Sequence, residues 1–207
     1  YRNDFKSFRV RGRFVFNYPH HDAVQKHIIR EVAIVPAHPA GKGPASKQFV
    51  DALAKLIPRL KRQATAWTQT PKIMIRADDL DTLQDLQGLI DATFSTKSVL
   101  IHDRAAPSKK HPRRFDDVRR AFREAADAEF WLHQFKLMEG VDDPDFIVVA
   151  IYDIPTNGRQ LVQQIGRIVR TRPGRIRRQT AWVIAAPENA RRIEATWERY
   201  QKYEEYA

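Results

Sequence analysis

The residues of this sequence that are best suited to chemistry are arginines, because a guanidinium donates two parallel hydrogen bonds to a phosphate. The densest group contains no acidic residue and consists of Arg167, Arg170, Arg172, Arg175, Arg177 and Arg178. Pro173 and Gly174 predict a turn within it, so we expect the arginines to gather around one helix end and the following strand. An acidic protein surface is the alternative partner, but we predict contacts with nucleic-acid phosphates.

Two further basic groups could extend such a surface. Residues 8–16 alternate apolar and basic side chains, which is typical of a half-buried strand. The basic face of that strand carries Arg9, Arg11 and Arg13. The other group lies in a proline-containing linker and consists of Lys109, Lys110, Arg113 and Arg114. We predict that both groups bind nucleic acid, and a solvated face without a ligand is the alternative for each.

The overall charge agrees with a polyanionic partner. The chain has 36 Lys and Arg against 25 Asp and Glu, a formal charge of +11 and a pI near 10.1. Phosphate neutralisation releases counterions, so RNA or DNA is the expected partner. No apolar run reaches the roughly 20 residues of a membrane helix, and no secretory leader is evident. We therefore expect no membrane partner, and a location in the cytoplasm or an organellar matrix rather than secretion.

Catalytic patterns are weak in this sequence. There are no cysteines, which excludes disulfides and thiolate metal sites, and the seven histidines match no zinc spacing. Asp153 is an outside candidate for a catalytic carboxylate, but a turn-capping role is favoured for it. We expect no cofactor, no metal site and no enzyme activity.

The elements that must position these residues are read from periodicity. Strands are predicted around residues 71–79, 97–103, 146–155 and 175–187, and the apolar run from Phe146 predicts a central strand buried on both faces. Helices are predicted at about 22–32, after Ser46, after Asp78 or Asp79, and after Gly158. One long helix is predicted from about Phe115 to Met138, and another ends the chain.

The last third has a family resemblance. An apolar strand ends in Tyr152-Asp153-Ile154, a basic helix follows, and the next predicted strand carries Arg178, Gln179 and Val183. Residues 146 to about 200 resemble the ferredoxin-like domain of the small CRISPR adaptation subunit and of the phenylacetate-catabolism repressors. The resemblance implies a ferredoxin-like fold, and it implies either that Asp153 holds a metal for phosphodiester cleavage or that the domain acts purely as a scaffold, since the family does both. The family usually adds a strand after the last helix, whereas this sequence stops at Ala207.

Together these patterns predict an α+β protein with ferredoxin-like βαβ units, mixed sheets, helices on one face and one long connecting helix. The expected organisation is an N-terminal α/β half (1–105), a basic linker and long helix (106–140), and a ferredoxin-like C-terminal half (141–207). The expected function is non-catalytic binding of nucleic acid. The alternatives are a structural subunit of a large ribonucleoprotein, such as an organellar ribosome, and a metal-dependent nuclease using Asp153. Other protein subunits and a homodimer are further expected partners.

Overall fold

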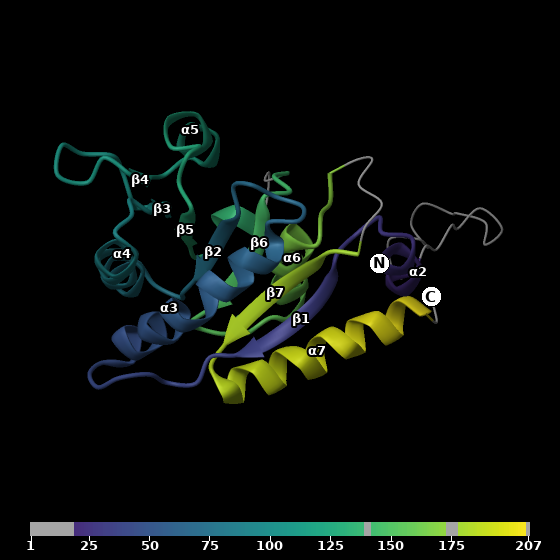
Figure 1. The fold of residues 1–207 in the computed structure, drawn as a ribbon. Helices are drawn as coiled ribbons and strands as arrows, with labels where there is room; N and C mark the ends of the chain where they lie inside the picture. The colour runs from purple at the N-terminus through teal and green to yellow at the C-terminus, as the bar shows by residue number, and fades with distance from the viewer. Residues whose placement is uncertain (1–18, 139–141, 173–177, 206–207) are drawn as a thin grey trace, which may run out of the picture.

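A sheet of parallel strands lies at the centre of the computed structural model, which describes residues 19–138, 142–172 and 178–205 (Figure 1). In this part of the chain the sheet has seven strands in the order β1-β7-β6-β2-β5-β3-β4, and each pair of neighbours is parallel. The strands are β1 (Glu31–Pro36), β2 (Lys72–Arg76), β3 (Val99–Ile101), β4 (Arg114–Phe115), β5 (Phe130–His133), β6 (Phe146–Ile151) and β7 (Thr180–Ala185). Because all strands run the same way, they share one amino edge, where they begin, and one carboxyl edge.

Helices cover both faces of this sheet. They are α2 (His20–Gln25), α3 (Ala45–Ala64), α4 (Leu80–Phe94), α5 (Val118–Glu124), α6 (Gly158–Ile168) and α7 (Pro187–Glu205), and a 3₁₀ turn, η2, spans Lys136–Met138. One apolar core holds residues of α3 and α4, such as Leu53 and Leu86. The other holds residues of α5, α6 and α7, such as Ile165 and Ile193. Two covered faces are what parallel strands require, and the crossovers that contain α3, α4, α5 and α6 carry these helices onto the sheet.

Strand β6 shows why the sequence folds in this way. All six of its residues are buried, and from Val148 onward they alternate between the two cores: Val148 and Ala150 face α3 and α4, while Val149 and Ile151 face the other side. β6 pairs with β7 on one side and β2 on the other. The prediction of a central strand buried on both faces is therefore confirmed.

The predicted fold class is wrong. The ferredoxin-like arrangement requires a mixed sheet with helices on one face, whereas this sheet is parallel and covered on both faces. The long helix predicted from 115 to 138 is instead β4, α5 and β5. Its apolar stripe left out Phe130 and Leu132, which face one core of the sheet while Trp131 faces the other. This alternation is that of a strand and not of a helix.

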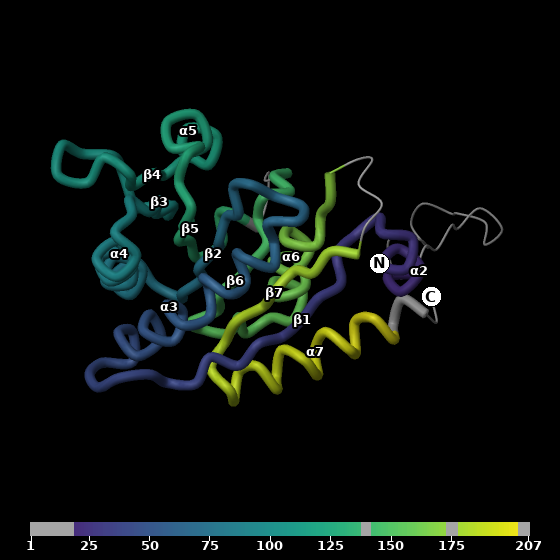
Figure 2. The backbone as a smooth tube through the Cα atoms, in the orientation of Figure 1, coloured from purple at the N-terminus to yellow at the C-terminus, as the bar shows by residue number. Residues whose placement is uncertain are grey.

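Strand β1 was not predicted, because its residues were divided between an expected helix over 22–32 and an expected loop from Pro36. The helix α2 ends at Gln25, and β1 pairs in parallel with β7, a strand from the other end of the sequence. Figure 2 shows the purple β1 beside the yellow-green β7, with α7 running back along them. Strands from 1–105, 106–140 and 141–207 thus join one sheet. Within the described ranges, no helix combines the length and apolar character that crossing a membrane demands.

Two helix starts follow the sequence signals. The Asp79 carboxylate accepts a hydrogen bond from the Thr82 backbone N–H at 2.8 Å and so caps α4. Asn157 caps α6 in the same way through the Arg159 N–H, also at 2.8 Å. Both caps lie at the carboxyl edge of the sheet, so each helix runs back towards the amino edge. The end of α6 is thereby placed beside the starts of β6 and β7.

Candidate nucleic-acid interface

Three of the predicted arginines meet at the amino edge. Arg170 and Arg172 follow the end of α6, and Arg178 precedes the start of β7. Arg170 forms an isolated bridge with Ile29, just before β1, and Arg178 lies against Glu31, the first residue of β1. We call Arg170, Arg172 and Arg178 the amino-edge arginine cluster. Arg167 lies in the last turn of α6, whereas Arg175 and Arg177 are outside the described residues.

Each arginine of this cluster is paired with a carboxylate of the chain. Arg172 Nη2 lies 2.6 Å from Asp145 Oδ2, and Arg178 Nη2 lies 2.6 Å from Glu31 Oε2. Arg170 Nη1 pairs with Asp142 Oδ1. An acidic protein surface was the alternative partner for these arginines. The acidic residues Asp142 and Asp145, which precede β6, do contact two of them. A phosphate would therefore have to compete with carboxylates that are already in place.

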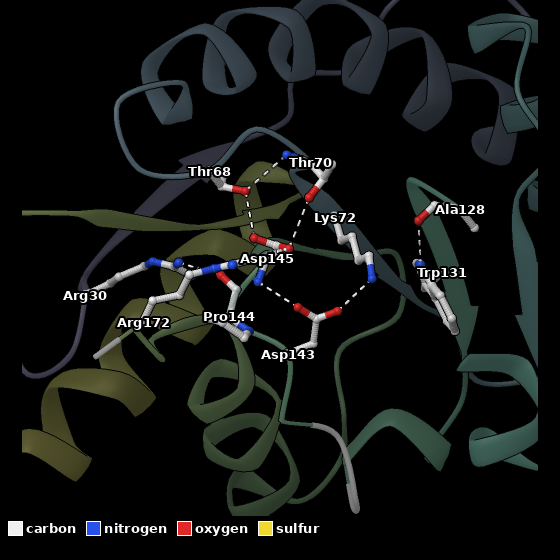
Figure 3. A network of polar contacts seen from close by, with 10 residues as sticks. All are labelled: Arg30, Thr68, Thr70, Lys72, Ala128, Trp131, Asp143, Pro144, Asp145 and Arg172. Atoms are coloured by element: carbon white, nitrogen blue, oxygen red, sulfur yellow. Dashed lines mark hydrogen bonds and ion pairs between the residues drawn. The ribbon is translucent and has the colours of Figure 1, made fainter. Parts of the chain in front are cut away.

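Asp145 is the most firmly held of these carboxylates (Figure 3). Its oxygens accept hydrogen bonds from the hydroxyl groups of Thr68 at 2.8 Å and Thr70 at 3.1 Å, besides the contact with Arg172. Burial opposes ionisation of Asp145, but the hydrogen bonds from Thr68, Arg172 and Thr70 outweigh it and keep its pKa below the usual value. Asp145 is therefore a charged, fixed anchor for Arg172.

Lys72, the first residue of β2, extends the same network along the amino edge of the sheet. Its Nζ lies 2.6 Å from Asp143 Oδ2, and Asp143 Oδ1 accepts a hydrogen bond from the Asp145 backbone N–H at 2.9 Å. The Lys72 ammonium also lies 5.5–5.8 Å from the ring centres of Phe122, Trp131 and Phe146. These contacts fix the loop that leads into β6, so the network is a rigid base beneath the arginine cluster.

Arg30 is a buried cation that the sequence did not single out. Its guanidinium donates to the backbone oxygens of Phe146, Ile168 and Pro144 at 2.8, 2.9 and 2.5 Å, and to the Gln179 side chain at 3.1 Å. Burial lowers its pKa to about 10, which leaves it charged at neutral pH. It therefore ties the end of α6 to the starts of β6 and β7. The available signal was a pair of charged residues, Arg30 and Glu31, within a run that is otherwise apolar from Ile28 to Val35.

The remaining basic groups are placed elsewhere. Lys109 and Lys110 are exposed in a turn before β4, the last strand in the sheet order. Arg113 pairs with Asp127 at 2.9 Å, and Arg114 Nε donates to the Gln87 side chain at 3.0 Å. The row Arg9, Arg11 and Arg13 lies outside the described residues. The structure thus brings together part of one predicted group, at the amino edge, and places a second group by another strand.

Asp153 lies at the carboxyl edge, beyond the end of β6. The chain leaves β2 towards β3 and leaves the neighbouring β6 towards β7, so the two connections diverge there, as at the ligand crevices of parallel sheets. Asp153 Oδ2 accepts the Asp78 backbone N–H at 2.9 Å, and its backbone oxygen accepts from the buried Arg76. Among the residues described, no group of three or more His, Asp or Glu is arranged to hold a metal ion. The Asp153 carboxylate therefore holds the turn before α4, whereas Asn157 caps α6, so the expected role of Asp153 as a cap of the turn into α6 is wrong. Asp153 also stands apart from Asp142, Asp143 and Asp145.

The comparisons with known proteins bear on the fold. The C-terminal domain of the DEAD-box protein Dbp5 matches with a TM-score of 0.51 at 19% identity, over 84% of this chain and 85% of that chain. S. cerevisiae Dbp5 L327V bound to RNA and ADP BeF3 matches with a TM-score of 0.57 at 16% identity, over 96% of this chain and 46% of that one. The ATP-dependent Type ISP restriction-modification enzyme LlaBIII bound to DNA gives 0.53 at 12% identity, over 82% and 13%.

Sequence comparison adds no family. No family model matches the chain. No curated protein matches it either. The structural matches overturn the resemblance to the ferredoxin-like domain of the CRISPR adaptation subunit and the phenylacetate-catabolism repressors, because they cover most of this chain and its own sheet is parallel and covered on both faces. The fold of this chain is therefore similar to the RecA-like α/β fold, as in the C-terminal domain of Dbp5.

Proposed function

We propose that this chain is a nucleic-acid-binding RecA-like domain that holds backbone phosphates at the amino-edge arginine cluster. The observation that carries the proposal is the meeting of Arg170, Arg172 and Arg178 at one edge of the sheet, on a base fixed by Arg30 and Asp145. The formal charge of +11 supports a polyanionic partner. The fold neighbours bound to RNA and to DNA support a nucleic acid, and both remain candidates.

Other basic residues are proposed to contribute in smaller measure. Arg167, Arg175 and Arg177 belong to the same stretch of sequence as the cluster and would extend it. The row Arg9, Arg11 and Arg13 and the group Lys109, Lys110, Arg113 and Arg114 are proposed as secondary phosphate contacts. Contacts with phosphates position a nucleic acid without reading its sequence, so we expect little sequence preference.

A nucleotide is a second candidate for the same arginines. One neighbour contains ADP BeF3 besides RNA, and another is ATP-dependent. Nucleotide and backbone phosphates offer a guanidinium the same chemistry. The sequence contains no complete G-x-x-x-x-G-K-[ST] loop, so on this proposal the arginines would reach nucleotide phosphates held mainly by another domain. Competition between a labelled oligonucleotide and magnesium nucleoside triphosphate distinguishes the two sites.

The alternatives raised from the sequence are less well supported. A nuclease centred on Asp153 needs several converging carboxylates, and the described residues provide no such group. The RecA-like fold gives no support to a structural subunit of a ribosome. Protein partners and a homodimer stay predictions.

Replacing the cluster by alanine tests the proposal. In the variant Arg170→Ala/Arg172→Ala/Arg178→Ala, we expect affinity for a single-stranded oligonucleotide to fall about tenfold or more at moderate salt. The slope of log K against log salt should become shallower by about 2, since each lost phosphate contact of a single strand contributes about 0.7. Fluorescence anisotropy over a salt series measures both quantities.

The matched control removes three arginines from the opposite edge. Arg159, at the start of α6, and Arg191 and Arg192, near the start of α7, are exposed and lie at the carboxyl edge. The variant Arg159→Ala/Arg191→Ala/Arg192→Ala loses the same charge and should keep a slope near that of the wild type. Equal effects of the two triple variants would mean that overall charge, and not this cluster, determines binding.

A further inference from the structure

The three ion pairs of the amino-edge arginine cluster differ in how their carboxylates are held. The side chain of Asp145 is 10% exposed, whereas that of Glu31 is 43% exposed and that of Asp142 is 82% exposed. Only Asp145, among these three, also accepts hydrogen bonds from threonine hydroxyl groups in the described part of the chain. The pairs of Arg170 and Arg178 are therefore the ones that water and other anions can reach.

The ion pairs of Arg170 and Arg178 also lack the full two-nitrogen, two-oxygen geometry. Arg178 directs both Nε, at 2.9 Å, and Nη2, at 2.6 Å, to the same Glu31 oxygen. Arg170 contacts one Asp142 oxygen through one nitrogen. A guanidinium binds an oxyanion best when two nitrogens meet two oxygens in parallel, and a phosphate presents such oxygens. Exposed pairs of this kind contribute little to stability, so their exchange for a phosphate is favourable.

We propose that Asp142 and Glu31 are resident anions that phosphate displaces from Arg170 and Arg178, while the Arg172–Asp145 pair stays closed. The inference rests on the proposed function and adds how the site would select its ligand. A ligand must supply at least two phosphate groups to exchange both carboxylates, which favours a polyphosphate chain or a nucleic-acid backbone over a single anion. Asp145 acts as a positioning residue, because it orients Arg172 and does not leave.

The test neutralises each carboxylate without changing its shape. Asp142→Asn and Glu31→Gln should each raise the affinity for a single-stranded oligonucleotide by about twofold to fivefold, the range of an exposed pair. Asp145→Asn should lower it, because Arg172 loses its anchor. Asp81→Asn is the matched control, since Asp81 is exposed at the start of α4, at the carboxyl edge, and its neutralisation changes the net charge equally. A second titration with magnesium nucleoside triphosphate shows whether the variants bind a nucleotide or a nucleic-acid backbone more tightly than the wild type does.

A second set of variants separates local exchange from overall charge. In an Arg170→Ala background, Asp142→Asn should have no effect beyond that of Asp81→Asn, because the arginine that it frees is gone. Unchanged affinity in Asp142→Asn and Glu31→Gln for both ligands would overturn the inference, and so would an equal gain in Asp81→Asn. If the arginines matter but the carboxylates do not, the inference alone fails. If neither matters, the proposed function fails with it.

Discussion

Arg30→Met should lower the free energy of unfolding by about 3–4 kcal/mol, which is large for a single substitution. Arg30 is 1% exposed, and its guanidinium donates to three backbone oxygens and the Gln179 side chain. Methionine fills part of the space but donates nothing, so buried carbonyl groups at the ends of α6 and in the loop before β6 lose a partner. An unsatisfied buried acceptor costs about 1–3 kcal/mol, and the recovered desolvation energy of the charge offsets part of the sum.

Urea denaturation followed by circular dichroism measures this loss. Arg178→Met is the control, because Arg178 is an exposed arginine of the same edge and should change stability by less than about 0.5 kcal/mol. If both variants lose the same small amount, Arg30 does not hold the amino edge together. The rigid base beneath the arginine cluster would then have to come from the Asp145 and Lys72 contacts alone.

Acid should destabilise the protein through His133. His133 is fully buried in β5, and neither ring nitrogen has a hydrogen-bond partner among the described atoms. Burial first, and then the neighbouring Arg76, lower its pKa from 6.5 to about 3. Between these values the unfolded chain binds a proton that the folded chain does not. The stability contributed by neutral His133 is therefore complete above pH 6.5 and is lost as the pH falls towards 3.

The size of this effect follows from the pKa shift. At about 1.4 kcal/mol per pH unit, the loss from pH 7 to pH 4 is on the order of 3 kcal/mol. In His133→Leu this part of the pH dependence should be absent, and leucine suits a site where the ring makes no hydrogen bond. His38→Leu, at an exposed histidine, should keep the wild-type profile. If the stability of His133→Leu and of the wild type fell in parallel from pH 7 to pH 4, His133 would not be the cause of the acid destabilisation.

The sequence predicted the buried strands well where their composition was uniform. The run that became β6 is apolar and rich in β-branched residues, so both the element type and its burial followed from the residues. The cap at Asp79 was an equally local signal. The sheet class could not be deduced in this way, because short strands joined by helices occur in both ferredoxin-like and RecA-like folds. Only the pairing of β1 with β7 and of β2 with β5 settles it.

Two elements were missed because periodicity was ambiguous. Between Phe115 and Met138 the apolar residues fit a helical stripe, and Phe130 and Leu132 were the discordant residues. They lie in a short strand whose four residues, including His133, are all buried, so no alternation of polar and apolar residues marks the period of two. β1 was missed because the run from Ile28 to Val35 contains Arg30 and Glu31, which resemble a helix surface. Arg30 is in fact buried against backbone oxygens, which only the tertiary structure supplies.

The candidate site was predicted in part. The sequence indicated that Arg170, Arg172 and Arg178 would gather around a helix end and a strand start, and this is where they lie. It did not identify which carboxylates accompany them, because Glu31 is 147 residues away from Arg178 in sequence and meets it only through the β1–β7 pairing. The roles of Thr68 and Thr70 beneath Asp145 were hidden for the same reason.

The central claim is that the chain binds nucleic acid through its phosphates. The most direct measurement is the affinity of the wild-type chain for labelled single- and double-stranded RNA and DNA across a series of salt concentrations. The account predicts binding at low salt and a linear fall of log K with log salt, with a slope corresponding to at least three phosphate contacts, roughly −2 or steeper. An absence of binding to all four ligands at low salt would contradict it, and the basic edge would then have to serve another polyanion or a protein.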